Sequence, residues 1–358
     1  MKFTDRSMKW AVIIAIFTIV LVFSGYYAAV IFQGKTDAGE VHAENTSDVD
    51  EYGEDGGNGD AEVNRDKDSP PLIADPENTR LTAGKIYSEK LVEEGSTNLL
   101  ILGEDKVSHL YDTVGIVSIS KNKGTMKFIM IPRDTYIDYS PEIREALDKA
   151  GKLRLAGIFK INYAHHIGTL IKYDGKFSAQ SASFLAAVIE EKFGVEVDDY
   201  VKINTAGFIK LVDLFGGVEI NVPYAMNYED PTQDLYIHLE KGVQRLDGSQ
   251  AEGFVRFRQG WKEDGSELQI GDIGRKQNQI NFLKAFIKQN GTIKKVDKVP
   301  EMFRILGKSV QSSIGVGDVL TKYMALAKNF IQDKYETEST ILEGKQFTIN
   351  GTSYINIE

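Results

Sequence analysis

The sequence predicts an α/β fold with a central mixed β-sheet that is covered by helices on both faces. Short apolar segments typical of strands alternate along the chain with amphipathic segments typical of helices, which is the pattern of a layered α/β domain. The chain has 358 residues, enough for one large domain with appendages, and it contains no internal repeat. The prediction is therefore a single layered domain that follows an N-terminal segment of different composition.

The individual elements follow from local periodicity and turn signals. The run NLLILG at 98–103 reads as a buried strand, and the turn Lys121–Gly124 separates two further strands. Strands are predicted at 98–103, 114–120, 125–131, 195–203, 218–222, 338–342, 346–350 and 353–357. Helices are predicted at 178–193, 206–215, 249–253, 273–289, 299–308 and 317–331.

The N-terminal segment reads as a membrane anchor. Residues 10–32 are uncharged and apolar over a length that crosses about 30 Å of hydrocarbon as a helix. Basic residues precede this run and acidic residues follow it, which places residues 1–9 in the cytoplasm and the rest of the chain outside. We therefore expect a single-pass type II protein of the cell membrane; a cleaved signal peptide fits less well because the apolar run is too long.

Residues 33–80 read as a disordered acidic linker. Residues 34–80 hold fourteen acidic residues against four basic ones, and they lack hydrophobic periodicity. This stretch accounts for the whole net charge of −10, because the remaining acidic and basic residues cancel. We expect a spacer between the membrane and an extracellular domain at 81–358.

Composition excludes several classes of function. The chain has no cysteine, so a disulfide, a thiol nucleophile and a cysteine-ligated metal are all excluded. The negative net charge argues against non-specific binding to nucleic acid. Patterns of serine hydrolases, zinc proteases and P-loop nucleotide-triphosphatases are absent from the sequence.

Two arginines stand close together in the second half of the chain. Val255 and Phe257 alternate with Arg256 and Arg258, a period of two that predicts extended backbone. Both guanidinium groups would then project to the same side. A solvated edge strand is the structural alternative for such a pair.

A predicted helix start follows this pair. Gly271 and Asp272 begin the helix, and Asp272, Arg275 and Gln279 then lie within roughly 60° of one another on one helix face. The free N–H groups and the dipole of a helix N-terminus favour an anion. Asp272 by itself is also a plausible N-cap.

Further along, the same face becomes apolar. Ile280, Leu283 and Ile287 continue the stripe, which core packing explains equally well. Arginines, an amide and a carboxylate ahead of an apolar stripe suit a doubly charged phosphate group that carries an apolar tail.

A second polar cluster follows the strand at 125–131. Arg133 and Asp134 come directly after it, Asp105 stands at a similar strand end, and Asp112 precedes the next strand. In open α/β sheets ligands gather at such ends. Asp105, Asp112 and Asp272 together suit Mg²⁺, with Mn²⁺ as an alternative, because hard cations prefer carboxylate, water and phosphate oxygens.

Some of these residues have simpler explanations. Arg133 and Asp134 form the kind of pair that is often a surface ion pair. His165 and His166 have no partner fixed by their spacing, and we interpret them as packing or rim residues.

The motifs and their order resemble the LytR-CpsA-Psr (LCP) proteins of Gram-positive bacteria. The resemblance runs from about residue 96 to 290, more loosely to 358, and includes the short cytoplasmic end with its single anchor. The segments that carry it are LLILGED at 99–105, DT at 112–113, IPRDT at 131–135, KINYA at 160–164, LFGGV at 214–218, RFR at 256–258 and GDIGR at 271–275 with Gln279.

The resemblance implies an LCP-type domain and an extracellular transfer reaction. Such proteins move an anionic glycopolymer, wall teichoic acid or a capsule-like chain, from undecaprenyl pyrophosphate to the C6 hydroxyl of N-acetylmuramic acid in peptidoglycan. The implied pyrophosphate-binding residues are Arg133, Arg256, Arg258, Arg275 and Gln279. The implied magnesium-associated residues are Asp105, Asp112 and Asp272, and either Asp105 or Asp134 is a candidate proton acceptor.

One position departs from the family pattern. Family members usually carry an arginine two residues before the aspartate at 112, and this chain has Leu110 there, with Lys106 and His109 as nearby substitutes. The loop 259–270 is also long and acidic. Two alternatives therefore stay open: a non-catalytic binder or regulator of polyprenyl-pyrophosphate lipids, and a polyprenyl pyrophosphate phosphatase that uses water as the acceptor.

Overall fold

A computed structural model describes residues 72–73, 79–105, 109–262, 264–290, 309–314, 322 and 336–358. The predicted anchor at 10–32 and most of the predicted linker at 33–80 lie outside these residues. So do the predicted helix at 299–308 and, apart from Lys322, the one at 317–331. Within the described ranges no helix is both long and apolar enough to cross a membrane.

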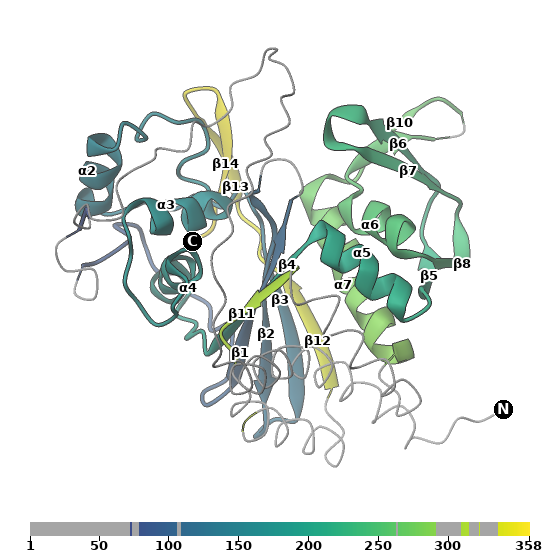
Figure 1. Cartoon of the computed structure of the whole chain (residues 1–358), viewed down its shortest axis with the longest axis horizontal. Helices are drawn as coiled ribbons and strands as arrows, with labels where there is room; N and C mark the ends of the chain where they lie inside the picture. The colour runs from purple at the N-terminus through teal and green to yellow at the C-terminus, as the bar shows by residue number, and fades with distance from the viewer. Residues whose placement is uncertain are drawn as a thin grey trace, which may run out of the picture.

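The centre of the molecule is a mixed six-stranded sheet with the order β11-β4-β1-β2-β3-β12 (Figure 1). Its strands are β1 Thr97–Glu104, β2 Tyr111–Ser120, β3 Thr125–Ile131, β4 Asp199–Asn204, β11 Val310–Ser312 and β12 Glu336–Ile341. Strands β1, β2 and β3 form an antiparallel meander, and β4 and β12 join it in parallel to β1 and β3. A parallel neighbour requires a long crossover, and helices supply the crossover between β3 and β4.

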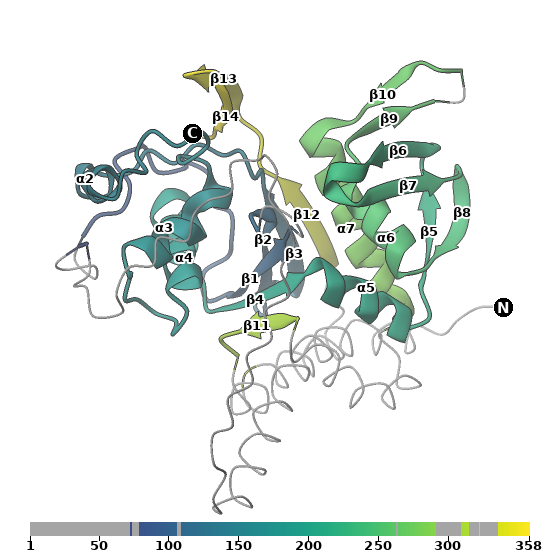
Figure 2. The same ribbon diagram turned by 45° about the horizontal axis from the view of Figure 1, so that its top comes forward.

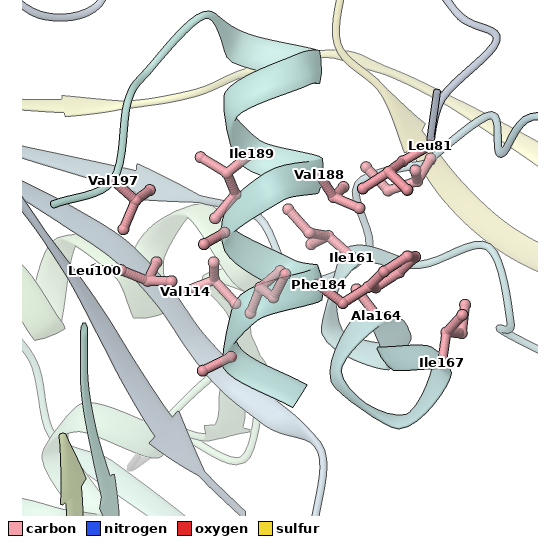
Figure 3. Packing of buried hydrophobic residues seen from close by; sticks show 14 of the residues in the cluster. Leu81, Leu100, Val114, Ile161, Ala164, Ile167, Phe184, Val188, Ile189 and Val197 are labelled. Atoms are coloured by element: carbon pink, nitrogen blue, oxygen red, sulfur yellow. The ribbon is translucent and has the colours of Figure 1, made fainter. Parts of the chain in front are cut away.

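Helices cover one face of the sheet and bury the larger core. They are α2 Pro141–Lys149, α3 Ala164–Leu170 and α4 Gln180–Phe193, with a short 3₁₀ helix η1 at Ile161–Tyr163. In Figure 3, Phe184 and Val188 of α4 lie between Leu100 and Val114 of the sheet and Ile167 of α3. All five side chains are fully buried, so this layer supplies most of the hydrophobic stabilisation on its side.

Helices and small β-ribbons form the layer on the opposite side (Figure 2). The helices are α5 Thr205–Leu214, α6 Gly248–Arg256 and α7 Gly271–Asn290. The strands are β5 Val218–Val222, β6 Met226–Asp230, β7 Leu235–Leu239, β8 Gly242–Leu246, β9 Gln259–Trp261 and β10 Glu267–Gln269, with the 3₁₀ helix η2 at Pro231–Gln233. A second core, which includes Phe254, Phe257 and Phe282, joins these helices to the ribbons.

The chain ends in a hairpin of β13 Lys345–Ile349 and β14 Thr352–Asn356. This hairpin packs on the loop after β3: the ring of Tyr136 lies 5.2 Å from Phe347 and 5.6 Å from Tyr354. The predicted sheet with helices on both faces is therefore confirmed, and the predicted C-terminal strands are present.

Two predictions about local structure are wrong. The strand predicted at 195–203 begins only at Asp199, and the residues predicted as extended around the arginine pair are helical as far as Arg256. Helix α6 begins with a capping box, in which Asp247 accepts from the backbone N–H of Gln250 and the Gln250 side chain accepts from the N–H of Asp247. This start commits residues 248–256 to a helix despite the two-residue alternation at its end.

Candidate functional site

The predicted polar residues meet at one end of the central sheet. Asp105 follows β1, Asp112 lies near the start of β2, and Arg133 follows β3. The antiparallel register of these three strands brings their ends together, because Gly103 pairs with Thr113 and Val114 pairs with Ile131. The C-terminus of α6 and the N-terminus of α7 complete the site from the opposite layer.

Asp112 accepts hydrogen bonds from three basic residues of the site. Arg133 Nη1 donates to its Oδ1, and Arg275 Nη1 donates to its Oδ2 at 3.1 Å. Its backbone oxygen accepts from Arg275 Nη2 at 3.3 Å and from Lys276 Nζ at 3.0 Å. Burial by itself would raise the pKa of Asp112, but Arg275 and Arg133 lower it to about 2, so the carboxylate is ionised.

The first turns of α7 carry the buried cations. Arg275 is 2% exposed and donates to Asp272 one turn earlier, as the predicted helix face requires. Lys276 is fully buried beside it, and burial followed by repulsion from Arg275 lowers its pKa to about 8. Sequence reasoning missed Lys276 because the helical periodicity places it on a different face from Arg275.

Arg256 is the last residue of α6 and is held by three oxygen acceptors. Its guanidinium lies 2.6 Å from Glu252 Oε1, 3.2 Å from Gln233 Oε1 and 3.5 Å from Asp105 Oδ2. Glu252 lies one helical turn before Arg256, so the helix itself positions this pair. The sequence did not single out Glu252 or Gln233, since neither is next to a motif.

Arg258 differs from Arg133, Arg256 and Arg275, which all form ion pairs with carboxylates. Its backbone oxygen accepts from the N–H groups of Ile270 and Gly271, but its guanidinium makes no hydrogen bond or ion pair with any side chain that the structure describes. Burial, followed by repulsion from Arg133 and Arg275, lowers the pKa of Arg258, and attraction to Asp112 and Asp272 offsets this only in part. An anion would relieve this repulsion, so Arg258 is the donor most available to a phosphate group.

Two cavities meet at these residues. A small polar cavity of about 20 Å³ is lined by Asp112, Tyr228, Gln233, Leu235, Arg256, Arg258, Gln259 and Arg275. A larger cavity of about 150 Å³ runs between the sheet and helices α5, α6 and α7. Its apolar lining includes Ile101, Ile203, Phe208, Val255, Phe282 and Leu283, and its polar lining includes Asp105, Asp112, Arg256, Arg275 and Gln279. The structure therefore joins a cationic pocket to an apolar one.

The apolar face of α7 differs in detail from the prediction. Leu283 lines the larger cavity, but Ile280 is buried elsewhere and the side chain of Ile287 lies outside the described residues. Gln279 and Phe282 line the cavity instead. The stripe that faces the cavity is therefore continuous with Arg275, at intervals of four and three residues.

Gln279 and Asp134 occupy different positions relative to the cavities. Gln279 donates to Val255 O at 3.3 Å, and its Oε1 is buried with no partner among the described residues. Asp134 lies behind Arg133: it accepts from Lys160 Nζ at 2.7 Å, and its carboxylate is 3.8 Å from Arg133 Nε. Asp134 does not line either cavity, whereas Asp105 lines the larger one.

The three predicted magnesium ligands do not form one cluster. No group of three acidic or histidine side chains in the described ranges is arranged to hold a metal ion. Asp112 and Asp272 share Arg275, while Asp105 contacts Arg256. One oxygen fits a hard cation, because Asp272 Oδ2 is buried without a partner in the described structure. A site of one or two carboxylates completed by phosphate oxygens and water therefore suits this chain better than a three-carboxylate site.

The position of the missing family arginine is not filled by His109. The His109 Nδ1 lies 3.2 Å from Glu104 Oε1, and its side chain is 69% exposed. Glu104 also pairs with Lys202 at 2.8 Å. Lys106 lies outside the described residues.

His165 is a packing residue, as the sequence interpretation expected. Its ring stacks on Tyr111 at 3.9 Å between centroids, and its Nε2 lies 3.1 Å from His109 O. Burial, followed by repulsion from His166, lowers its pKa to about 3, so the ring is neutral at ordinary pH. His166 is exposed beside it, with ring centroids 4.0 Å apart.

Known proteins share both the sequence pattern and the fold. The chain is 28% identical over 274 residues to the polyisoprenyl-teichoic acid–peptidoglycan teichoic acid transferase TagU of Oceanobacillus iheyensis, covering 75% of this chain and 72% of that protein. It is 26% identical over 271 residues to TagU of Bacillus mycoides, covering 75% of each. The crystal structure of Bacillus subtilis TagV is similar with a TM-score of 0.52 at 22% identity, covering 75% of this chain and 92% of that one.

These similarities extend over most of the described domain. The chain covers 75% of the length of TagU of Bacillus mycoides but only 53% of a longer relative from Staphylococcus aureus. The profile of the LytR_cpsA_psr family matches residues 69–358, which include both helical layers and every residue of the site. The chain belongs to the LytR_cpsA_psr family.

Proposed function

We propose that this protein is a membrane-anchored phosphotransferase. It moves an anionic glycopolymer, such as wall teichoic acid or a capsule-like chain, from undecaprenyl pyrophosphate to the C6 hydroxyl of N-acetylmuramic acid in peptidoglycan. The observation that carries the proposal is Arg258, a guanidinium without a described partner, placed among Arg133, Arg256 and Arg275 beside an apolar cavity. The curated names of the relatives, teichoic acid transferases, support the substrate class.

The chain's own residues account for donor binding. Arg256, Arg258 and Arg275 line the polar cavity and supply paired donors that match phosphate oxygens. Gln279 adds an amide to the lining of the apolar cavity. The apolar cavity accepts the part of the polyprenyl chain nearest the pyrophosphate, since its apolar lining begins beside the arginines.

The transfer step relies on positioning and on charge neutralisation. The arginines stabilise the charge that develops on the phosphate oxygens, as fixed donors do in other phosphoryl transfers. Asp105 is the candidate acceptor of the hydroxyl proton, because it lines the cavity, whereas Asp134 is paired with Lys160 behind Arg133.

We propose Mg²⁺, with Mn²⁺ as an alternative, as the cofactor. Asp112 and Asp272, which share Arg275, would hold it, whereas Asp105 contacts Arg256 and would lie outside this pair. An ion held there would supply positive charge to the phosphate oxygens.

The proposed location follows from the sequence. Residues 10–32 anchor the chain in the cell membrane, residues 1–9 lie in the cytoplasm, and the domain at 81–358 faces outward. This arrangement places the arginine site on the side of the membrane where peptidoglycan is found.

Arg258 gives the sharpest test, because its removal leaves no described carboxylate unpaired. The full chain in detergent is incubated with Mg²⁺ and a polyprenyl-pyrophosphate-linked saccharide, with and without peptidoglycan fragments. We expect acceptor-dependent release of polyprenyl phosphate, reduced about 100-fold in Arg258→Ala and partly restored in Arg258→Lys. The matched control is Arg154→Ala, an exposed arginine on the other side of the sheet, which should retain full activity.

The same experiment separates the alternatives. Leu110, in place of the family arginine, favours a non-catalytic binder, and tight lipid binding without any release would establish that function instead. Release of polyprenyl phosphate without peptidoglycan would identify a phosphatase. Equal turnover in wild type and Arg258→Ala would refute the assigned pyrophosphate site.

A further inference from the structure

The hairpin of β9 and β10 presents one polar and aromatic face to solvent. In its antiparallel register Trp261 pairs with Glu267 and Gln259 pairs with Gln269. Directly opposed residues, and residues two apart on one strand, project to the same side. Trp261 is 58% exposed, and the other three side chains are exposed as well.

The opposite face of the hairpin is held against the domain. Gly260 lies so close to β6 that a Cβ at this position would be 2.3 Å from Asn227 O. Leu268 packs against the second hydrophobic core. The base is closed by hydrogen bonds from Ile270 N and Gly271 N to Arg258 O, so the hairpin is fixed to the start of α7. The side chains of Gln259, Trp261, Glu267 and Gln269 are therefore held on the solvent side of the hairpin.

The chemistry of this face suits an uncharged sugar. An indole offers a flat apolar surface for the C–H face of a pyranose ring, and amide and carboxylate groups bind hydroxyl and acetamido groups. Gln269 Nε2 donates to Glu267 Oε1 at 2.5 Å, so these two polar groups are already aligned beside the indole.

The face is continuous with the phosphate site. Gln259 lines the small polar cavity together with Arg256, Arg258 and Arg275. Trp261 lies two residues further along the same strand, about 7 Å away. Trp261 is therefore within reach of a saccharide bound at the arginine site.

Charge selects between the two saccharides of the proposed reaction. Residues 259–269 contain three acidic residues and one lysine, so the hairpin repels a polyanionic glycopolymer. The N-acetylglucosamine units of a peptidoglycan strand carry no charge and meet no such repulsion.

We propose that this face is a subsite for the acceptor glycan, in which Trp261 stacks on an N-acetylhexosamine next to the reacting sugar. The inference rests on the proposed function for the identity of the acceptor. The binding of the sugar itself is independent of catalysis and is tested separately.

Intrinsic fluorescence tests binding directly. The chain has two tryptophans, so Trp10→Phe leaves Trp261 as the only tryptophan reporter in the full chain. Titration with the tetrasaccharide of N-acetylglucosamine, without any lipid donor, should produce a saturable change in its emission. The change should persist in an Arg258→Ala background, which disables the proposed transferase and leaves the hairpin intact.

Kinetics tests the role of the subsite. Trp261→Ala should raise the KM for peptidoglycan fragments at least tenfold and leave kcat and donor binding within twofold, while Trp261→Phe should restore most of the affinity. Tyr236→Ala removes an equally exposed aromatic residue from β7, outside the hairpin, and should change nothing.

Two results would overturn the proposal. One is an emission of Trp261 that does not respond to the tetrasaccharide while Trp261→Ala keeps the wild-type KM. The other is a response to an anionic glycopolymer in place of the tetrasaccharide, which would assign the face to the donor. Loss of transfer activity in every variant, with tetrasaccharide binding retained, would count against the proposed function and leave the subsite supported.

Discussion

At the scale of single residues, Asp112 makes the burial of Arg275 and Lys276 possible. It receives donors from Arg133, Arg275 and Lys276 through both its carboxylate and its backbone oxygen. A buried charge is tolerated only where a partner compensates it. Asp112, a carboxylate at the start of a strand, is thus the partner that Arg133, Arg275 and Lys276 share.

Arg275→Met and Arg258→Met should therefore differ in stability. Arg275→Met leaves Asp112 and Asp272 without their shared partner and should lower the free energy of unfolding by about 3–5 kcal/mol. Arg258→Met removes a charge that lies among like charges and should leave stability unchanged or slightly higher. Urea denaturation of both variants in metal-free buffer measures the difference, and equal destabilisation would contradict the assigned pairing.

His165 should make stability depend on pH between 6.5 and 3. The folded protein keeps the ring neutral down to a pKa of about 3, whereas the unfolded chain binds a proton near pH 6.5. The unfolded state therefore gains protons first as the pH falls, and stability that is full above 6.5 is lost toward 3.

His165→Gln should remove this component. Between pH 7 and 4.5, the wild type should lose about 2–3 kcal/mol more than the variant, measured from urea unfolding curves. His238→Gln, a change at a 59% exposed ring, serves as the control. Parallel curves for wild type and His165→Gln would show that the buried ring does not titrate in this way.

At the scale of elements, the site depends on where two helices end and begin. Helix α6 ends at Arg256, and α7 begins at Gly271, so both helices direct residues of one terminus into the same pocket. The alternation of Val255, Arg256 and Phe257 suggested a strand, but the capping box of Asp247 and Gln250 was the stronger local signal. Two alternating pairs are too short a pattern to override a helix start.

Asp247→Ala should destabilise the protein through α6. The variant loses the acceptor for Gln250 N, and we expect a cost of about 1 kcal/mol in the free energy of unfolding. Because α6 also positions Arg256, transfer activity should fall as well. Asp264→Ala, which removes an acceptor in an exposed turn, should cost less. The two variants are compared by thermal unfolding, and equal midpoints would indicate that the cap contributes little.

At the scale of the whole molecule, function depends on the space between layers. The cavity of about 150 Å³ exists because the sheet and helices α5, α6 and α7 leave an apolar gap beside the arginines. The opposite layer is a hydrophobic core around α4 (Figure 3). The cavity therefore lies on the side of the sheet that α5, α6 and α7 cover, which is where the proposed function places the polyprenyl chain.

Leu283→Trp should fill this gap. We expect binding of a donor with a long polyprenyl chain to weaken about tenfold, while a donor with a single short isoprenoid unit binds as before. Leu170→Trp, the same change in α3 on the other layer, is the control. The affinity of each donor is measured by titration against the wild type, Leu283→Trp and Leu170→Trp. An equal loss of affinity for the short and the long donor in Leu283→Trp would place the lipid elsewhere.

Much of this protein follows from the sequence by itself. Period and turn signals are local properties, so they predicted strands β1, β2, β3 and β5, helices α4, α5 and α7, and the helix face that joins Asp272 to Arg275. The order of the motifs was also sufficient to indicate the family.

Contacts between distant segments were decided by the tertiary structure. The pairing of Arg256 with Asp105, the burial of Lys276, the lack of a described partner for the Arg258 guanidinium and the separation of Asp105 from the other two carboxylates all depend on how two layers meet across the sheet. The contacts of Arg256 with Asp105 and of Lys276 with Asp112 join residues more than a hundred positions apart, and no local pattern encodes them. The same holds for the apolar cavity, which is a property of packing between elements and has no counterpart in any one of them.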